Sequence, residues 1–255
     1  FLDTAHGLGL SVVPGLSDYP YTQQPGNCLQ TDCDCYEQVK HSYAGDLVKG
    51  GWLASGKYRE RGKYHPAIKT IIIINEPDLK LGQMAPKKFC KGILSALDGI
   101  LDAEKEAGVQ GPDLPKFTVT FSFGMCDQCH KPQLAGNKPA LNQMLELRIA
   151  FKYPEAYGYT PKNDLMSVYN TRFINSFNTQ NSASELQDLF FTAYGQEFSG
   201  KPVFIGEFHS IHPPRDQLTE MNTILSMATS SQEFMGLNFF EFQVRYDKGG
   251  TEAEF

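Results

Sequence analysis

The stretch Ile-Ile-Ile-Ile-Asn-Glu-Pro-Asp at residues 71–78 decides the fold that we expect for this chain. Four consecutive β-branched residues leave no polar face, so the run predicts a strand buried on both sides, as in a parallel sheet covered by helices. Pro77 has no N–H for a strand ladder and is therefore expected to end the strand. Glu76 then lies where a buried strand opens into a loop, which is the end at which parallel α/β proteins place their chemistry.

A second stretch repeats this pattern. Residues 203–209 read Val-Phe-Ile-Gly-Glu-Phe-His, so an apolar strand again runs out into a glycine and a glutamate. Gly206 removes side-chain bulk, and Glu207 is expected at the carboxyl end of the strand. Glu241 is a third carboxylate at a predicted strand end, and is the main rival if one of the other two is misassigned.

Strands and helices alternate along the whole chain. The sequence predicts strands at residues 8–16, 71–74, 116–124, 172–178, 203–206 and 236–242, and helices at residues 36–56, 86–107, 139–151, 184–198 and 216–232. This rhythm is typical of a parallel sheet with helices outside it. We expect residues 1–255 to form a single (β/α)₈ TIM-barrel domain whose first two strands and last helix lie outside this stretch; the alternative is an open doubly wound sheet.

Composition narrows the classes of function. The chain has 255 residues, a mass of 28.5 kDa and a formal net charge of −6, which argues against a nucleic-acid partner. No apolar run approaches the roughly 20 residues that a membrane-spanning helix needs. Phe1 opens directly into a predicted helix end with no signal peptide before it, so we expect the start to be processed, trimmed or unobserved.

The cysteines favour an oxidising compartment. Six are present, at Cys28, Cys33, Cys35, Cys90, Cys126 and Cys129. An even number in loop-like stretches suits disulfides, and hence secretion. Free thiols and a structural zinc are the competing interpretations, and residues 126–130 (Cys-Asp-Gln-Cys-His) also fit the attachment pattern of a c-type haem.

The two strand-end glutamates suggest a specific chemistry. In a barrel Glu76 and Glu207 would line the same mouth, and paired carboxyl groups are what glycoside hydrolysis requires. One group must hold a proton for the leaving oxygen, while the other stays ionised to attack the sugar or stabilise its charge. Two like charges at short range push their pKa values apart, which lets identical side chains take different roles.

Two motifs carry a family resemblance. Asn75-Glu76-Pro77 and Gly206-Glu207-Phe208, each after an apolar strand, resemble the acid/base and nucleophile signatures of the clan A retaining glycoside hydrolases, which are (β/α)₈ barrels. In that clan the two glutamates follow strands four and seven, and the same offset of three strands separates them here. The resemblance implies that Glu76 is the general acid/base, that Glu207 is the nucleophile and that Asn75 hydrogen-bonds the sugar 2-OH.

Departures from the clan pattern bear on the substrate. Where many members have a tyrosine that steadies the nucleophile, this chain offers Asn178, and where many have a tryptophan on strand eight it has Phe240 and Glu241. Phe240-Glu241-Phe242 near the last predicted strand, with Tyr246 soon after, is loosely similar to the β-1,3-glucan hydrolases and glucanosyltransferases of the clan. The resemblance therefore implies a β-glucan-type polysaccharide as substrate. Trp52 falls in a predicted helix and is expected in the core.

Further side chains are candidates for sugar contacts. Asp18, Tyr19 and Tyr21 follow the first predicted strand, so we expect them to rim the same mouth, with the aromatic rings stacking on sugar faces. His209 lies two residues past Glu207 and is expected to bind sugar or to tune the nucleophile. His209 and His212 lack a clustered third ligand, so we expect no metal and no other cofactor.

Three functions remain open. The favoured one is a secreted or cell-wall retaining β-glycosidase or transglycosylase with a polysaccharide or oligosaccharide substrate. The second is a barrel that binds carbohydrate, or has a structural role in an extracellular assembly, without catalysis. The third is a different enzyme on an open α/β sheet, such as a metal-dependent hydrolase.

Overall fold

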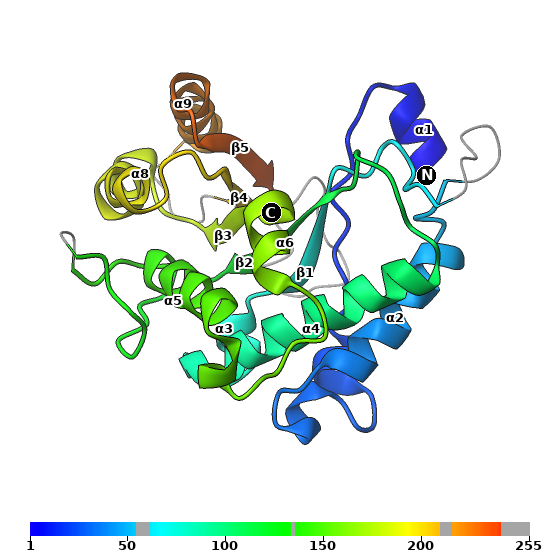
Figure 1. Ribbon diagram of the computed structural model, residues 1–255. Helices are drawn as coiled ribbons and strands as arrows, with labels where there is room; N and C mark the ends of the chain where they lie inside the picture. The colour runs from blue at the N-terminus through cyan, green and yellow to red at the C-terminus, as the bar shows by residue number, and fades with distance from the viewer. Residues whose placement is uncertain (55–61, 134–135, 210–215, 241–255) are drawn as a thin grey trace. The chain divides into compact units, whose positions relative to one another are not determined.

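The computed structural model describes residues 1–54, 62–133, 136–209 and 216–240 (Figure 1). The chain divides into two compact units, each built from two separate segments. The first unit comprises Phe1–Val119 with Leu145–Ile174, and the second comprises Thr120–Met144 with Asn175–Phe255. A single domain over residues 1–255 stays a prediction.

The chain contains a five-stranded sheet with the strand order β1-β2-β3-β4-β5. Its strands are β1 (Thr70–Asn75), β2 (Lys116–Phe121), β3 (Asn175–Thr179), β4 (Val203–Phe208) and β5 (Phe234–Phe239). The main helices are α1 (Leu2–Gly7), α2 (Tyr36–Val48), α3 (Pro77–Lys80), α4 (Pro86–Glu106), α5 (Leu141–Lys152), α6 (Leu165–Arg172), α7 (Ala183–Leu186), α8 (Thr192–Glu197) and α9 (Gln217–Ser230). Helices thus alternate with strands that pair in parallel, and the predicted α/β fold class is confirmed.

Strand β1 is buried as its composition predicts. Ile71, Ile73 and Ile74 are fully buried, while Ile72 is half-buried. The expected strand at residues 8–16 is different: within the part of the chain that the structure describes, it makes two isolated parallel bridges and no ladder. They run from Val12 to Ile68 and from Gly15 to Ile72. Pro14 lies between these bridges and has no N–H to donate, which keeps this neighbour of β1 from forming a regular ladder.

Helices α2 and α4 pack side by side in the first unit (Figure 1). Gly99 lets them approach closely, because a Cβ there would lie 2.4 Å from the carbonyl oxygen of Tyr36. Helix α2 ends at Val48, well before the expected residue 56, since Gly50 and Gly51 follow and Gly51 has a φ of +72°. The expectation that Trp52 lies in a helix is therefore wrong.

The second unit has an aromatic core beside strands β3 to β5. The helix expected at residues 184–198 is instead α7, a π-helical turn at Gln187–Phe191 and α8 in succession. Ring contacts connect these turns to one another and to the sheet. The rings belong to Phe177, Phe190, Phe191, Tyr194, Phe198 and Phe234. Strand β3 begins at Asn175 rather than at residue 172, because Arg172 is still part of α6.

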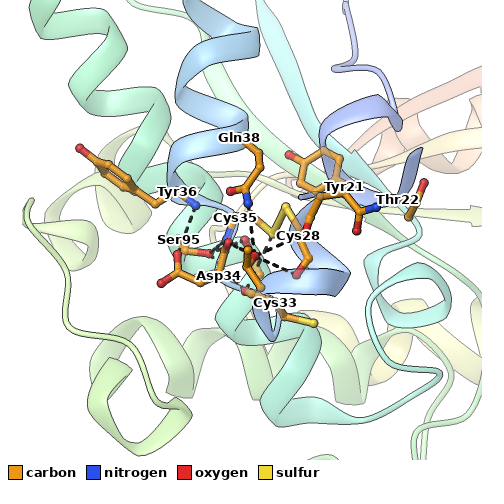
Figure 2. The surroundings of a disulfide bond; sticks show 12 residues. Tyr21, Thr22, Cys28, Cys33, Asp34, Cys35, Tyr36, Gln38 and Ser95 are labelled. Atoms are coloured by element: carbon orange, nitrogen blue, oxygen red, sulfur yellow. Dashed lines mark hydrogen bonds between the residues drawn. A yellow bond between two sulfur atoms is a disulfide. The ribbon is translucent and has the colours of Figure 1, made fainter. Parts of the chain in front are cut away.

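Four of the six cysteines form disulfides, as the loop-like spacing predicts. The pairs are Cys28–Cys35 and Cys126–Cys129, while Cys33 and Cys90 are buried free thiols. Figure 2 shows the first pair, where the backbone N–H of Cys35 donates to Ser95 Oγ of α4 at 2.8 Å. The two cysteines of the haem-like pattern are bonded to each other. No helix in the described ranges is both long and apolar enough to cross a membrane.

Candidate functional site

Glu76 directly follows β1 in an unusual backbone conformation. Its φ and ψ are 51° and 55°, in the left-handed region that residues with a side chain seldom adopt. The Glu76 carbonyl accepts hydrogen bonds from the N–H groups of Leu79 and Lys80, at 3.1 and 3.0 Å, and so starts the short helix α3. Such a conformation costs about 1–3 kcal/mol and is found most often where function requires a particular side-chain direction.

Asp18 reaches the same loop. Both of its carboxylate oxygens accept from Lys80 Nζ, at 2.8 and 2.9 Å, so the segment after Leu16 is tied to helix α3. The Tyr19 side chain is 52% exposed. Within the first unit the structure thus brings Asp18 beside the loop that follows Asn75 and Glu76, as the sequence predicts. The ion pair of Lys80 with Asp18 was not predicted, because a lysine near the surface is usually solvated and Asp18 is distant in the sequence.

Tyr21 does not rim the site. The side chain is fully buried, and its hydroxyl donates to the carbonyl oxygen of Ile73 at 2.7 Å. Burial, with a smaller effect from the nearby Asp18 carboxylate, raises the pKa of Tyr21 well above its usual value. The hypothesis that Tyr21 stacks on a sugar is therefore wrong, and its ring is part of the support under β1.

Glu207 lies near the end of β4, opposite Asn178 of β3. Phe177 pairs with Ile205, but the next residue, Asn178, pairs with Glu207, so Gly206 is passed over. A shift of this kind is a β-bulge, and bulges turn a side chain to a different direction. Asn178 is buried and Glu207 is half-buried. The structure therefore brings together the predicted nucleophile and the asparagine that we expected to take the place of a tyrosine.

Gly206 is enclosed by polar side chains. A Cβ at this position would lie 2.5 Å from Thr120 Cγ2, 2.8 Å from Asn178 Oδ1 and 3.0 Å from Ser176 Oγ. Thr120 and Ser176 were not predicted, although the sequence carries a signal for them. Hydroxyl residues alternate with large apolar residues along β2, and both sets are buried. Buried hydroxyl groups on one side of a strand suggest a polar interior rather than a solvent face.

His209 and Phe240 lie together beyond Glu207. Their ring centroids are 6.0 Å apart, and the Phe240 N–H donates to the Phe208 carbonyl oxygen at 2.9 Å. Burial lowers the pKa of His209, which favours its neutral form. Glu241 and His212 lie outside the described residues. Among the residues that are described, no three His, Cys, Asp or Glu side chains gather in a way that could hold a metal ion.

The candidate residues fall into two groups. Asn75, Glu76, Asp18 and Tyr19 belong to the first unit, whereas Asn178, Glu207, His209 and Phe240 belong to the second. Each group is assembled within its own unit at the carboxyl end of a strand, or in a loop tied to that end. That Glu76 and Glu207 act on one substrate stays a prediction.

Comparison with known proteins identifies the fold. No family model matches the sequence, and no curated protein matches it. The structure is similar to the AHE enzyme from Alicyclobacillus herbarius, with a TM-score of 0.52 and 11% identity over 96% of this chain and 68% of that one. It is also similar to a β-glucosidase from Thermotoga maritima bound to deoxynojirimycin, with a TM-score of 0.53 and 10% identity over 96% of this chain and 67% of that one.

The same β-glucosidase bound to noeuromycin gives a TM-score of 0.53 and 10% identity, over 96% of this chain and 68% of that one. At this level of identity the likeness shows the fold alone. The five-stranded parallel sheet with its helices corresponds to part of a TIM barrel, in agreement with the sequence-based prediction.

Proposed function

We propose that this protein is a retaining β-glycoside hydrolase or transglycosylase that acts on a β-glucan-type polysaccharide. Glu76 is assigned as the general acid/base and Glu207 as the nucleophile. A fold shared with a β-glucosidase supports the class of reaction. The position of each glutamate at the carboxyl end of a parallel strand supports the assignment of the two residues.

The proposed reaction has two displacements. The Glu207 carboxylate attacks the anomeric carbon while Glu76 donates a proton to the departing glycosidic oxygen, which leaves a glycosyl ester on Glu207. Glu76, now ionised, then takes a proton from a water molecule or a sugar hydroxyl, whose oxygen displaces Glu207. Water completes a hydrolysis and a sugar hydroxyl completes a transfer. The mechanism requires the two carboxyl groups to be about 5–5.5 Å apart.

The observation that carries the proposal is the pairing of Glu207 with Asn178. An asparagine offers two N–H donors, which suit a carboxylate that must stay ionised and point at an anomeric carbon. The strand shift that skips Gly206 would serve no purpose in a regular sheet, since it interrupts the ladder. An interrupted ladder beside a carboxylate is typical of positions next to an active site, where a bulge sets the direction of a side chain.

The unusual backbone of Glu76 supports its role in the same way. Glu76 adopts a left-handed backbone conformation although it has a side chain, and strained positions of this kind are concentrated at active sites. Asn75, the last residue of β1, is proposed to bind the sugar 2-OH. Asp18, Tyr19, His209, Phe240 and Glu241 are proposed as further sugar contacts.

The two disulfides support secretion. Disulfides persist in oxidising compartments and are rare in the cytosol. We therefore place the protein outside the cell or in a cell wall, where a β-glucan substrate would be found.

Chemical rescue of glutamate variants tests the assignment. On an aryl β-glucoside with a good leaving group, Glu207→Gly should lose turnover by orders of magnitude. Azide should restore that turnover and give the α-glycosyl azide, because azide replaces the missing nucleophile in a single inversion. Glu76→Gly needs no acid for such a leaving group and should give the β-glycosyl azide instead. On a polysaccharide, Glu76→Gln should lose about 10²–10⁴-fold in kcat/KM.

Glu37→Gln, an exposed glutamate on α2, is the matched control and should keep full activity. Equal activity in wild type, Glu76→Gln and Glu207→Gln would overturn the assignment. Binding of β-glucan without any turnover would favour the alternative, a glycosidase-like protein that binds carbohydrate or has a structural role.

A further inference from the structure

The first unit contains a cavity at the other end of β1 from Glu76. It has a volume of about 320 Å³, and its lining includes Asp3, Val12, Trp52 and His65. Val12 forms its bridge with Ile68, which precedes β1, whereas Glu76 follows the last residue of β1. At about 3.3 Å per residue, the eight residues from Ile68 to Glu76 span roughly 25 Å. This cavity is therefore separate from the loop that carries Glu76.

Trp52 is held rigidly in the wall of this cavity. Its ring meets that of Tyr43 edge to face, with centroids 5.5 Å apart. The Tyr43 hydroxyl lies 2.5 Å from the hydroxyl of Tyr64, which donates to Glu104 Oε1 at 2.5 Å. Arg172 then donates to both oxygens of Glu104, at 2.8 and 2.9 Å. This buried network holds the Trp52 ring in place before a ligand arrives. The side chain therefore loses little conformational entropy on binding.

Polar groups in the same wall are also fixed. The His65 backbone N–H donates to the Trp52 carbonyl oxygen at 2.7 Å, so the two residues are locked together. His65 Nδ1 accepts from the Ala67 N–H at 3.2 Å, which leaves Nε2 to donate to Asp3 Oδ1 at 3.0 Å. The His65 side chain is 4% exposed, but that of Asp3 is 67% exposed. The cavity thus presents an accessible carboxylate, oriented by a buried histidine, beside an indole ring.

We propose that this cavity binds one or two sugar residues of a β-glucan, as a second site in the first unit away from Glu76. The choice of sugar rests on the proposed function. A hexose has a face of C–H groups, which suits the negative face of an indole, and an edge of hydroxyl donors, which suits a carboxylate acceptor. Gly51, also in the wall, has open space where a Cβ would be, so a sugar ring can approach the backbone.

A second site has a clear use on a polymer. Once one stretch of chain is bound, another stretch of the same polysaccharide is present at high effective concentration at the catalytic site. The site is expected to matter for long chains and to be irrelevant for a small aryl glucoside. Its effect should therefore appear in KM for polysaccharide and leave kcat unchanged.

The chain contains a single tryptophan, which makes the test direct. All indole fluorescence comes from Trp52, so a change in emission reports on this cavity. The Glu207→Gln variant, which is expected not to degrade the ligand, is titrated with β-1,3- and β-1,4-gluco-oligosaccharides. A saturable shift in emission is expected. Asp3→Ala should weaken this binding at least about tenfold, whereas the control Asp113→Ala, at an exposed residue outside the lining of the cavity, should leave it unchanged.

The outcomes separate this proposal from the proposed function. Turnover of β-glucan by the wild type with no change in Trp52 emission would overturn the second site and leave the enzyme assignment intact. A saturable shift without turnover would support the site while contradicting catalysis. A shift with tetramethylammonium but with no oligosaccharide would show a cation site and overturn the sugar assignment.

Discussion

Asn178 lies opposite Glu207 in the parallel pairing of β3 with β4, one residue further along β4 than the pairing of Phe177 with Ile205 would give. The extra residue is Gly206, where an added Cβ would meet the side chains of Thr120, Ser176 and Asn178 within 3.0 Å. A glycine and a register shift thus act together: the missing Cβ makes room for polar side chains of β2 and β3, and the shift pairs Glu207, rather than Gly206, with Asn178. Both features can be tested by substitution.

Gly206→Ala should disturb this arrangement strongly. Its Cβ would lie 2.5 Å from Thr120 Cγ2 and 2.8 Å from Asn178 Oδ1, so buried neighbours must move. We expect the free energy of unfolding to fall by about 1–3 kcal/mol, as for other overpacked cores, and kcat on an aryl glucoside to fall as well. Denaturant titration and steady-state kinetics measure the two effects.

Gly195→Ala is the matched control. Gly195 lies in helix α8, has no positive φ and has open space at the Cβ position. Alanine should stabilise this helix by about 0.5–1 kcal/mol and leave activity unchanged. Equal stability of both variants would show that Gly206 is not enclosed as described.

Substitutions of Asn178 should change the pH profile of kcat/KM, because Asn178 lies opposite Glu207. In Asn178→Asp, a carboxylate replaces an amide opposite Glu207, and like charges favour the protonated form of one of them. The acid limb of the profile of kcat/KM should therefore move to higher pH. Asn178→Leu removes the donors without adding charge, so it should lower kcat with a smaller shift of the limb. Identical profiles for both variants and the wild type would contradict a functional contact.

Much of this arrangement follows from local sequence. Four isoleucines in a row predict a buried strand, and the proline after Glu76 predicts its end, because backbone chemistry and burial both act over a few residues. The end of α2 was misplaced for an equally local reason. Gly50 and Gly51 stop the helix early, and Trp52 consequently lines a cavity rather than the core of a helix pair.

Other features depend on contacts between distant segments. Tyr21 is buried against β1, where its hydroxyl donates to the carbonyl oxygen of Ile73. No sequence pattern near residue 21 reveals that partner. The pairing of Asn178 with Glu207 depends on a shift that becomes apparent only when two strands are aligned. The sequence can indicate which carboxylate ends a strand, but the direction in which it points is a tertiary property.

His209 gives a prediction for stability against pH. Burial lowers its pKa below the usual 6.5, so the unfolded chain binds more protons than the folded chain in the window between the folded pKa and 6.5. Stability should therefore rise with pH through that window and fall as the solution is made more acidic than about pH 6.5. In His209→Gln this part of the pH dependence should disappear.

The measurement is the free energy of unfolding of both proteins at pH 7 and pH 5, from urea titrations. Carboxylates and other histidines contribute equally to both proteins, so the difference isolates His209. A wild type that loses no more stability than the variant between the two pH values would contradict the burial of this ring.

Glu76→Gly separates the function of the side chain from the stability of its backbone. Glu76 has a φ of 51°, a conformation that glycine adopts without strain. We expect the substitution to raise the free energy of unfolding by about 1 kcal/mol while turnover of β-glucan is lost, the combination expected of a strained active-site position. Glu76→Ala keeps a Cβ and should lose turnover without this gain in stability.

Gln83→Gly provides the control, because Gln83 is exposed and has a nearly identical φ of 50° in the loop after α3. It should be stabilised by a similar amount and keep full activity. Thermal unfolding and kinetics on the same preparations decide the matter. If Glu76→Gly destabilised the protein while Gln83→Gly stabilised it, the Glu76 side chain would be stabilising the folded state. Its unusual backbone conformation would then no longer support a catalytic role.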